Sequence, residues 1–191
     1  SCLTFEVLVR SNIQGRAYEI FRKEGPLALL PLDANRYQII WTASTSKSTD
    51  RLNSSKSFLL DNLSTLVPEY LMLDQINRDI NVFPVSLSLS LPILSSKNVV
   101  FVGDSFHTFH PVGGQGLNTC WRDVNVIYDI FARNVSTSSN TLNIFKYKYY
   151  IKRSLDIIST IVVTDTLIKV FVNNNYLLLP LRKISFLLLN K

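Results

Sequence analysis

The stretch FVGDSFHTFHPVGGQGLNTCWRDV, residues 101–124, holds four of the six glycines of the chain and both of its histidines. It is entered from NVVFVGD, residues 98–104, an apolar run ending in a glycine and an acid, which is the form of a buried parallel strand that leads into a ligand loop. Beyond the glycines, apolar residues recur every three or four positions, as on an amphipathic helix. We therefore predict a buried strand over 99–102, a loop over 111–116 and a helix over 117–131 whose N-terminus opens to a cleft.

A loop of this composition can bind an anionic or electron-rich ligand edge. The start of a helix leaves backbone N–H groups unpaired and carries partial positive charge. Gly113, Gly114 and Gly116 let a ligand approach the main chain, because no Cβ stands in the way. Asp104, at the end of the predicted strand, is placed to accept hydrogen bonds from a ligand hydroxyl. The loop is not a Walker phosphate loop, since no Gly-Lys-Ser/Thr follows it, and it departs from G-x-G-x-x-G because position 119 is threonine.

Composition narrows the class of protein. The chain has 191 residues, 47% hydrophobic and 18% charged, which predicts a globular protein with one ordinary domain or two small ones sharing a core. Its net charge of +6 is spread over scattered basic residues, so we expect no nucleic-acid partner. Cys2 and Cys120 are too few for a disulfide framework or a metal-ligand set, and a reducing compartment is expected.

The remainder of the chain predicts a mixed α+β fold. Three early segments have the apolar, β-branched and aromatic composition of an antiparallel sheet, namely 2–10, 25–32 and 36–44. Leucines near helical spacing over 49–70 predict one or two short helices, and the alternation of Val or Leu with Ser over 80–91 predicts a strand. We expect a sheet domain with short helices over 1–95, a strand-loop-helix over 96–135, and two or three C-terminal helices over 136–191.

The C-terminal segment 157–189 is apolar enough to raise the question of a membrane span. Charged and Asn residues interrupt it, so it lacks the ~20 continuous apolar residues that a span needs. We expect it to pack as helices instead. The N-terminus shows no signal-peptide pattern. Because the first residue is Ser1 and the sole methionine is Met72, we expect the chain to be a piece of something longer.

The glycine-rich stretch also carries a family resemblance. VVFVGDSFHTFHPVGGQGLNTCWRDV, residues 99–124, resembles the second flavin-binding motif of the FAD-dependent aromatic-ring hydroxylases, which share a para-hydroxybenzoate-hydroxylase-like fold. Its ending Arg-Asp-Val, residues 122–124, is most similar to the branch that hydroxylates prenylated rings in ubiquinone biosynthesis. AYEIFRKEGPLALLPL, residues 17–32, is similar to the substrate-domain strands of that family. TDTLIKVF and LRKISFLLL, residues 164–171 and 181–189, are similar to its C-terminal helices.

The resemblance implies a flavin monooxygenase fold and a set of cofactor contacts. It implies that Asp104 binds the ribityl chain of FAD and that the following loop lines the isoalloxazine ring. The cofactor-binding residues that it implies are Gly103, Asp104, Pro111, Gly113, Gly114, Gln115, Gly116, Leu117 and Asn118. In the family, flavin reduced by NAD(P)H reacts with O₂ to a C4a-hydroperoxide, which hydroxylates an electron-rich phenol. The cofactor supplies this chemistry, so no catalytic acid or base is expected among the side chains.

Two functions stay open. The family also uses an N-terminal G-x-G-x-x-G unit for the ADP half of FAD and a mid-chain Asp-Gly motif, and neither occurs in these 191 residues. The chain is therefore the flavin-side and substrate-side portion of a hydroxylase, inactive alone, or a non-catalytic remnant or interaction module without stable FAD binding. For the first, the resemblance implies a small prenylated phenol or quinone precursor as substrate and a quinone-biosynthesis complex as partner. It also implies a location in the cytoplasm or peripherally on the cytoplasmic face of the inner membrane.

Several residues have a functional and a structural interpretation. His107 and His110 lack further ligands at metal spacing, so we expect hydrogen-bonded structural roles and no metal site. Ser105 does not form a nucleophile elbow, because the second glycine of G-x-S-x-G is missing. Arg122 and Asp123 are expected to support the helix. The leucines at 87, 89 and 91 could line a prenyl tunnel or belong to an ordinary sheet core.

Overall fold

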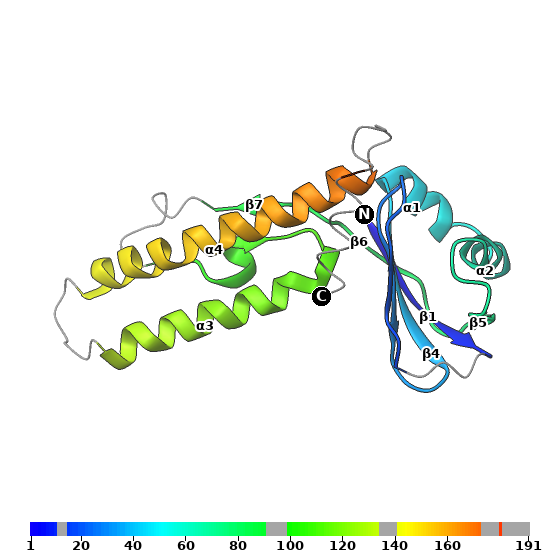
Figure 1. Cartoon of the computed structure of the whole chain (residues 1–191), viewed down its shortest axis with the longest axis horizontal. Helices are drawn as coiled ribbons and strands as arrows, with labels where there is room; N and C mark the ends of the chain where they lie inside the picture. The colour runs from blue at the N-terminus through cyan, green and yellow to red at the C-terminus, as the bar shows by residue number, and fades with distance from the viewer. Residues whose placement is uncertain (11–14, 91–98, 134–140, 173–179, 181–191) are drawn as a thin grey trace. The chain divides into compact units, whose positions relative to one another are not determined.

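The computed structural model describes residues 1–10, 15–90, 99–133, 141–172 and 180 (Figure 1). The chain divides into two compact units, one of residues 1–85 with 168–191 and one of residues 86–167. The α+β class is confirmed, and the three predicted domain ranges remain a prediction.

The first unit is built on an antiparallel sheet, as the early apolar segments predict. Its strands lie in the order β2-β3-β4-β1-β5, with β6 also paired to β1, and every pair is antiparallel. Phe5 lies opposite Ile39, which in turn lies opposite Leu29. The strands are β1 (Cys2–Val9), β2 (Tyr18–Ile20), β3 (Leu27–Pro31), β4 (Arg36–Thr42), β5 (Leu73–Ile76) and β6 (Asn81–Phe83).

Two short helices cover one face of this sheet. They are α1 (Thr45–Leu52) and α2 (Lys56–Ser64), and the side chains of Ser44 and Ser55 cap their first turns. Leu59 and Leu63 of α2 pack against alternate sheet residues that are fully buried, among them Leu3, Val7, Ile39 and Trp41. The predicted helices over 49–70 are therefore confirmed, and period-two burial of the strands supplies the core.

The predicted strand over 80–91 is interrupted. It splits into β6 and the two-residue β7 (Ser88–Leu89), with Pro84 after the end of β6. Proline has no N–H for a ladder hydrogen bond, which accounts for the break. Leu87 and Leu89 are 54% and 43% exposed, so the sheet-core interpretation is wrong for them. Leu91 lies outside the described residues, and the tunnel remains a prediction.

The second unit contains two long helices and a short ribbon (Figure 1). The ribbon pairs β7 with β8 (His107–Thr108), and the helices are α3 (Gln115–Arg133) and α4 (Thr141–Val172), of which residues 168–172 fall in the first unit. The helix predicted over 117–131 is confirmed within α3. One prediction is wrong here, since residues 99–102 are not a strand. Of the two or three helices expected over 136–191, the structure describes the 32-residue α4, and most of the remainder lies outside the described residues.

The second core joins both helices to the segment that precedes β8. Phe106, Ile130, Tyr149 and Ile157 are buried in it. Most of the predicted helical segment 157–189 beyond residue 172 lies outside the described residues. Among the helices that the structure describes, none is both long and apolar enough to span a bilayer.

Candidate functional site

The turn at Gly103 and Asp104 begins the site. Gly103 has φ +58°, a backbone conformation that side-chain-bearing residues rarely adopt, and its added Cβ would lie 3.3 Å from Sγ of Cys120 in α3. The hydroxyl of Ser105 closes the turn, because it donates to the carbonyl of Val102 and accepts from the N–H of the same residue. The turn is thus a single tight η2 segment (Gly103–Ser105) lying against α3.

Phe106, directly after the turn, fits the second core. It is 2% exposed and meets the ring of Tyr150 edge-on, with centroids 5.0 Å apart. Its N–H donates to the carbonyl of Gly103 at 2.8 Å, and its carbonyl accepts from the N–H of Ser90. The large side chain therefore anchors the turn and the ribbon to α4 instead of disturbing them.

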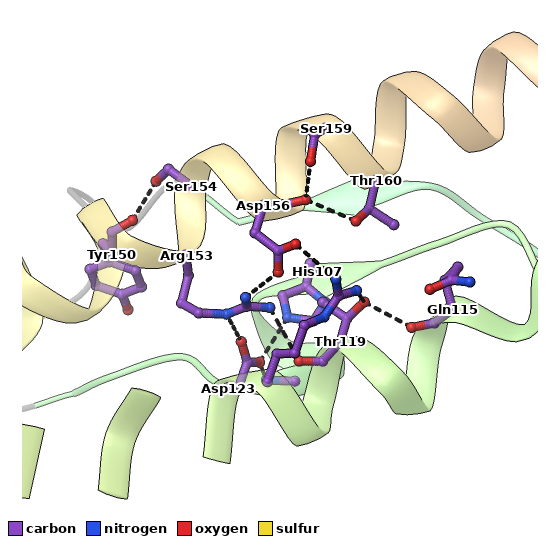
Figure 2. Close-up of polar contacts among 12 residues, drawn as sticks. His107, Gln115, Thr119, Asp123, Tyr150, Arg153, Ser154, Asp156, Ser159 and Thr160 are labelled. Atoms are coloured by element: carbon purple, nitrogen blue, oxygen red, sulfur yellow. Dashed lines mark hydrogen bonds and ion pairs between the residues drawn. The ribbon is translucent and has the colours of Figure 1, made fainter. Parts of the chain in front are cut away.

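Asp123 of α3 is the hub that holds the turn in place (Figure 2). Its buried carboxylate accepts from the backbone N–H of Gly103 at 3.0 Å and lies 2.8 Å from Nε2 of His107. Its other oxygen accepts from Nε of Arg153 in α4 at 2.5 Å. One side chain therefore joins the turn, the ribbon strand β8 and both helices. The expectation that Asp123 supports the helix is confirmed.

Arg153 and Arg122 extend this network along the two helices. Arg153 also pairs with Asp156 and donates to the carbonyl of Thr119 at 3.2 Å. Arg122 donates to Asp156 at 2.8 Å and to the hydroxyl of Thr119 at 3.0 Å. Figure 2 shows the side chains of Arg153, Asp156 and Thr119 converging between α3 and α4. Because the charged groups pair with one another, their burial is tolerated.

The electrostatics of the network fix its charges. Burial alone would raise the pKa of Asp123, but hydrogen bonds from His107 and Arg153 bring it below the ordinary value. Burial alone would lower the pKa of Arg153, but its bonds to Asp123 and Asp156 raise it. Burial raises the pKa of Tyr149, and the charge of Asp123 raises it further. Near neutral pH, Asp123 and Arg153 are thus an ion pair beside a neutral phenol.

Glycines open the start of α3. Gly113 and Gly114 have φ of +70° and +58°, and they form the short η3 turn (Val112–Gly114) that leads into the helix. A Cβ placed on Gly114 or Gly116 would meet no heavy atom within 4 Å. Gln115 turns its amide back to donate to the carbonyl of Gly113 at 3.1 Å. The main chain at the helix start is therefore bare and reachable from outside, as a ligand that touches backbone requires.

The nine predicted cofactor-binding residues all belong to this turn and helix start. None of those whose exposure is described is buried, and Asp104, Leu117 and Asn118 are exposed. Burial, followed by the negative charges of Asp104 and Asp123, raises the pKa of the Cys120 thiol. The turn that carries Asp104 lies against α3 at Cys120, because a Cβ added to Gly103 would be 3.3 Å from the Cys120 Sγ. The structure thus brings both halves of the predicted site to one end of α3. A loop was predicted over 111–116, and the structure instead has η3 followed directly by α3.

The two histidines differ in their surroundings. His107 is fully buried and pairs with Asp123, as the structural interpretation predicts. Burial lowers the pKa of His110, so this side chain favours the neutral form. Within the described residues, no group of three or more His, Cys, Asp or Glu side chains is arranged to hold a metal ion.

Arg153 is the residue of the buried network beside the site that sequence reasoning missed. It lies on the buried face of α4, one turn from Tyr149 and from Ile157, which are both in the core. A charge at a helical position that is otherwise apolar was the available signal, since such a residue needs a buried partner. That partner, Asp123, is 30 residues away in the sequence.

Comparison with known proteins gives matches over most of the chain. The family described as FAD binding domain matches residues 3–147. The 3-demethoxyubiquinol 3-hydroxylase of Escherichia coli is 27% identical over 158 residues, covering 82% of this chain and 40% of that protein. The mitochondrial ubiquinone biosynthesis monooxygenase COQ6 of Dictyostelium discoideum is 27% identical over 203 residues, covering 91% of this chain and 41% of that protein. The chain thus spans about two fifths of the length of these relatives.

The fold has a counterpart among solved structures. PqsL of Pseudomonas aeruginosa, described as a probable FAD-dependent monooxygenase, matches with a TM-score of 0.71 at 16% identity. The match covers 90% of this chain and 48% of that structure. At this identity the likeness concerns the fold alone.

Proposed function

Because the chain belongs to the FAD binding domain family, we propose that it forms the flavin-facing and substrate-facing part of a hydroxylase acting on a prenylated phenolic ring in quinone biosynthesis. The cofactor is FAD and the reductant is NAD(P)H. The observation that carries the proposal is the bare backbone at the start of α3, where a Cβ on Gly114 or Gly116 would meet open space, while the turn at Gly103 lies against Cys120 of the same helix. The names of the E. coli and Dictyostelium relatives support the substrate class.

The residues present fit the flavin end of FAD. FAD, once bound and reduced by NAD(P)H, supplies the oxygen chemistry, in which O₂ gives one atom to the ring as hydroxyl and the other leaves as water. Asp104 would accept hydrogen bonds from the ribityl hydroxyls. Backbone N–H groups of Gln115, Gly116 and Leu117, at the positions where a helix start leaves N–H groups without helical partners, would hold the electron-rich edge of the ring system. Asp123 holds the turn against α3, because its carboxylate accepts a hydrogen bond from the N–H of Gly103.

Activity and location follow from the same proposal. The chain alone does not hydroxylate, because it contains no G-x-G-x-x-G to hold the ADP half of FAD. Its substrate is a small prenylated phenol or quinone precursor, and its partners are other quinone-biosynthesis proteins. We place it in the cytoplasm or peripherally on the cytoplasmic face of the inner membrane, for which its net charge of +6 gives support.

Flavin retention tests the proposal. The chain is joined to the part of the E. coli hydroxylase that it does not match, and flavin absorbance is measured after desalting. We expect the joined protein to retain FAD and the chain alone to lose it. Gly116→Val should abolish retention without unfolding the protein, because the added side chain enters space that is open in the chain itself. His110→Ala is the matched control and should retain most of the flavin.

Three results would count against this assignment. Stoichiometric FAD on the chain alone, or undiminished FAD in Gly116→Val, would show that the site lies elsewhere. A joined protein that folds but retains no FAD would favour the alternative, a non-catalytic interaction module. Circular dichroism of each variant establishes that it is folded.

A further inference from the structure

A cavity of about 550 Å³ lies in the first unit, and it is rich in positive charge. Its wall is formed by the turn between β2 and β3, by β4, and by the helices α1 and α2. The charged side chains in this wall are Arg22, Lys23, Glu24, Lys47, Asp50 and Arg51. Four cations and two carboxylates leave an excess of two positive charges, so the electrostatics of the cavity favour an anionic ligand.

Two of the cations meet at one aromatic ring. The guanidinium carbons of Arg22 and Arg51 lie 5.4 Å and 4.2 Å from the ring centroid of Trp41. Trp41 is fully buried, and its strand β4 lies between β3 and β1 in the sheet. Because a guanidinium is attracted to the face of an indole, this fixed ring holds both arginine side chains close to each other.

Hydrogen-bond donors exceed acceptors around this ring. Glu24 accepts from Nη2 of Arg51 at 2.5 Å and from Lys47, but it lies 3.8 Å from Nη1 of Arg22, which is too far for a hydrogen bond. Four buried nitrogens have no acceptor among the described residues, namely Nε and Nη2 of Arg22, Nη1 of Arg51 and Nε1 of Trp41. Leaving buried donors unpaired costs free energy, so the cluster favours a ligand that is rich in acceptor oxygens.

Glu24 stands in the cluster as an internal anion with which such a ligand would compete. Lys47 and Arg51 hold its pKa at about 2, so it is ionised near neutral pH. Its side chain is 31% exposed and belongs to the turn between β2 and β3, so it can turn outward as a ligand enters. An incoming oxyanion would then take over the hydrogen bonds of Lys47 and Arg51 and also reach Arg22.

We propose that this cavity binds a phosphate group through Arg22, Lys47 and Arg51, in competition with Glu24. A phosphate monoester carries up to two negative charges and three acceptor oxygens, which match the excess charge and the unpaired donors better than a carboxylate does. Planar guanidinium groups bind two such oxygens at once.

The ligand also carries an apolar group. Phe58 and Leu66 belong to the same wall, and Phe58 is 60% exposed, so an apolar group attached to the phosphate can contact them. An organic phosphate in solution and the headgroup of a phospholipid share this chemistry. The proposal goes beyond the flavin function, because the cavity is lined by none of the residues assigned to the cofactor.

The emission of Trp41 reports occupancy of the cavity. Trp121→Phe leaves Trp41 as the only tryptophan of the 191-residue chain, which is titrated with phenyl phosphate at constant ionic strength. We expect a saturable change in emission, and we expect Lys47→Met to raise the dissociation constant about tenfold, since it removes a charged hydrogen-bond donor. Lys56→Met removes the same charge from α2 outside the cavity wall, and this matched control should change the constant less than about twofold.

Glu24→Gln gives a result of the opposite sign. Removing the competing carboxylate should strengthen the binding of phenyl phosphate about threefold or more, whereas a purely structural Glu24 would leave binding unchanged or weaken it. Lys47 is 53% exposed, so Lys47→Met keeps the fold and the test stands even if Glu24→Gln unfolds the first unit. Unchanged or weaker binding by a folded Glu24→Gln, or equal effects of Lys47→Met and Lys56→Met, would overturn the proposal.

Two further probes identify the source of the phosphate. Cosedimentation with dioleoyl phosphatidic acid vesicles that Lys47→Met weakens would assign the site to a lipid headgroup. Saturation by phenyl phosphate without binding to these vesicles would assign it to a soluble organic phosphate. Either result supports the proposal. Absence of binding to both probes overturns it, and so does phenylacetate that binds as tightly as phenyl phosphate.

Discussion

Asp123→Asn should destabilise the second unit strongly while leaving the first unit intact. The substitution keeps the size of the side chain but removes the charge that pairs with Arg153, whose side chain is only 3% exposed. Breaking one partner of a buried ion pair costs about 3–5 kcal/mol, because the other charge stays buried. Arg153 keeps Asp156 and the carbonyl of Thr119 as partners, so we expect the lower end, about 3 kcal/mol.

Urea unfolding followed by the helical circular dichroism signal measures this change, since most helical residues belong to α3 and α4. With an m value of about 2 kcal/mol/M, a loss of about 3 kcal/mol lowers the midpoint by about 1.5 M. Asp129→Asn, on the same helix but outside the network described above, is the control and should shift the midpoint by less than about 0.3 M, the range of ordinary surface changes.

A double substitution separates the ion pair from other effects. In Asp123→Asn alone, the buried charge of Arg153 loses its carboxylate partner. Replacing Arg153 by Met as well removes that charge, so the double variant should lose less stability than the sum of the two single changes. The reasoning is refuted if Asp123→Asn and Asp129→Asn behave alike, or if the two changes are additive. Either result would mean that the network contributes little to the fold of this unit.

Three further predictions concern the first unit. Gly25→Ala should lower the free energy of unfolding by about 1–3 kcal/mol in urea titrations, because φ is +132° and the new Cβ would lie 2.8 Å from the carbonyl oxygen of Thr42; an unchanged midpoint would contradict it. Arg51→Met should cost about 1 kcal/mol and shift the emission of Trp41, since the guanidinium lies 4.2 Å from the ring centroid; unchanged emission argues against the contact. Lys47 and Arg51 lower the pKa of Glu24 to about 2 from 4.5. The stability that ionised Glu24 contributes is therefore complete above pH 4.5 and is lost as the pH falls towards 2. Glu24→Gln should flatten this acid-side loss of stability, measured as denaturation midpoints against pH.

Features that depend on neighbouring residues could be predicted from the sequence. The antiparallel sheet, the helices near 45–64 and the helix over 115–133 follow from periodicity and turn residues. The glycine run before an amphipathic helix predicts a helix start whose main chain a ligand can approach, and the open space at Gly114 and Gly116 agrees with it; the assignment of that ligand as flavin came from the family resemblance and stays a prediction. The interruption at Pro84 could also have been predicted, because a proline removes a donor from the hydrogen-bond ladder. The alternation of Leu and Ser around it instead predicted a continuous strand.

Features that depend on distant residues could not be predicted. The pairing of Asp123 with Arg153 joins positions 30 residues apart, and nothing near either residue specifies the other. The strand predicted over 99–102 fails for a related reason, since a parallel strand exists only beside its neighbour. An apolar run therefore indicates that a segment can form a strand beside a neighbouring strand, but it does not indicate where that neighbouring strand comes from.

The apolar periodicity of α3 predicts the helix correctly but not which of its faces is buried in this unit. Apolar spacing predicts the helix from Leu117 to Phe131, and ordinary reasoning would turn that stripe towards the core of the unit. The structure turns it outward, because Asp123 and Thr119 on the opposite face are held by Arg153 and by hydrogen bonds to the turn. A buried carboxylate is stable only when its charge and hydrogen bonds are paired, as those of Asp123 are. The polar network therefore determines which face of the helix turns towards the core of this unit.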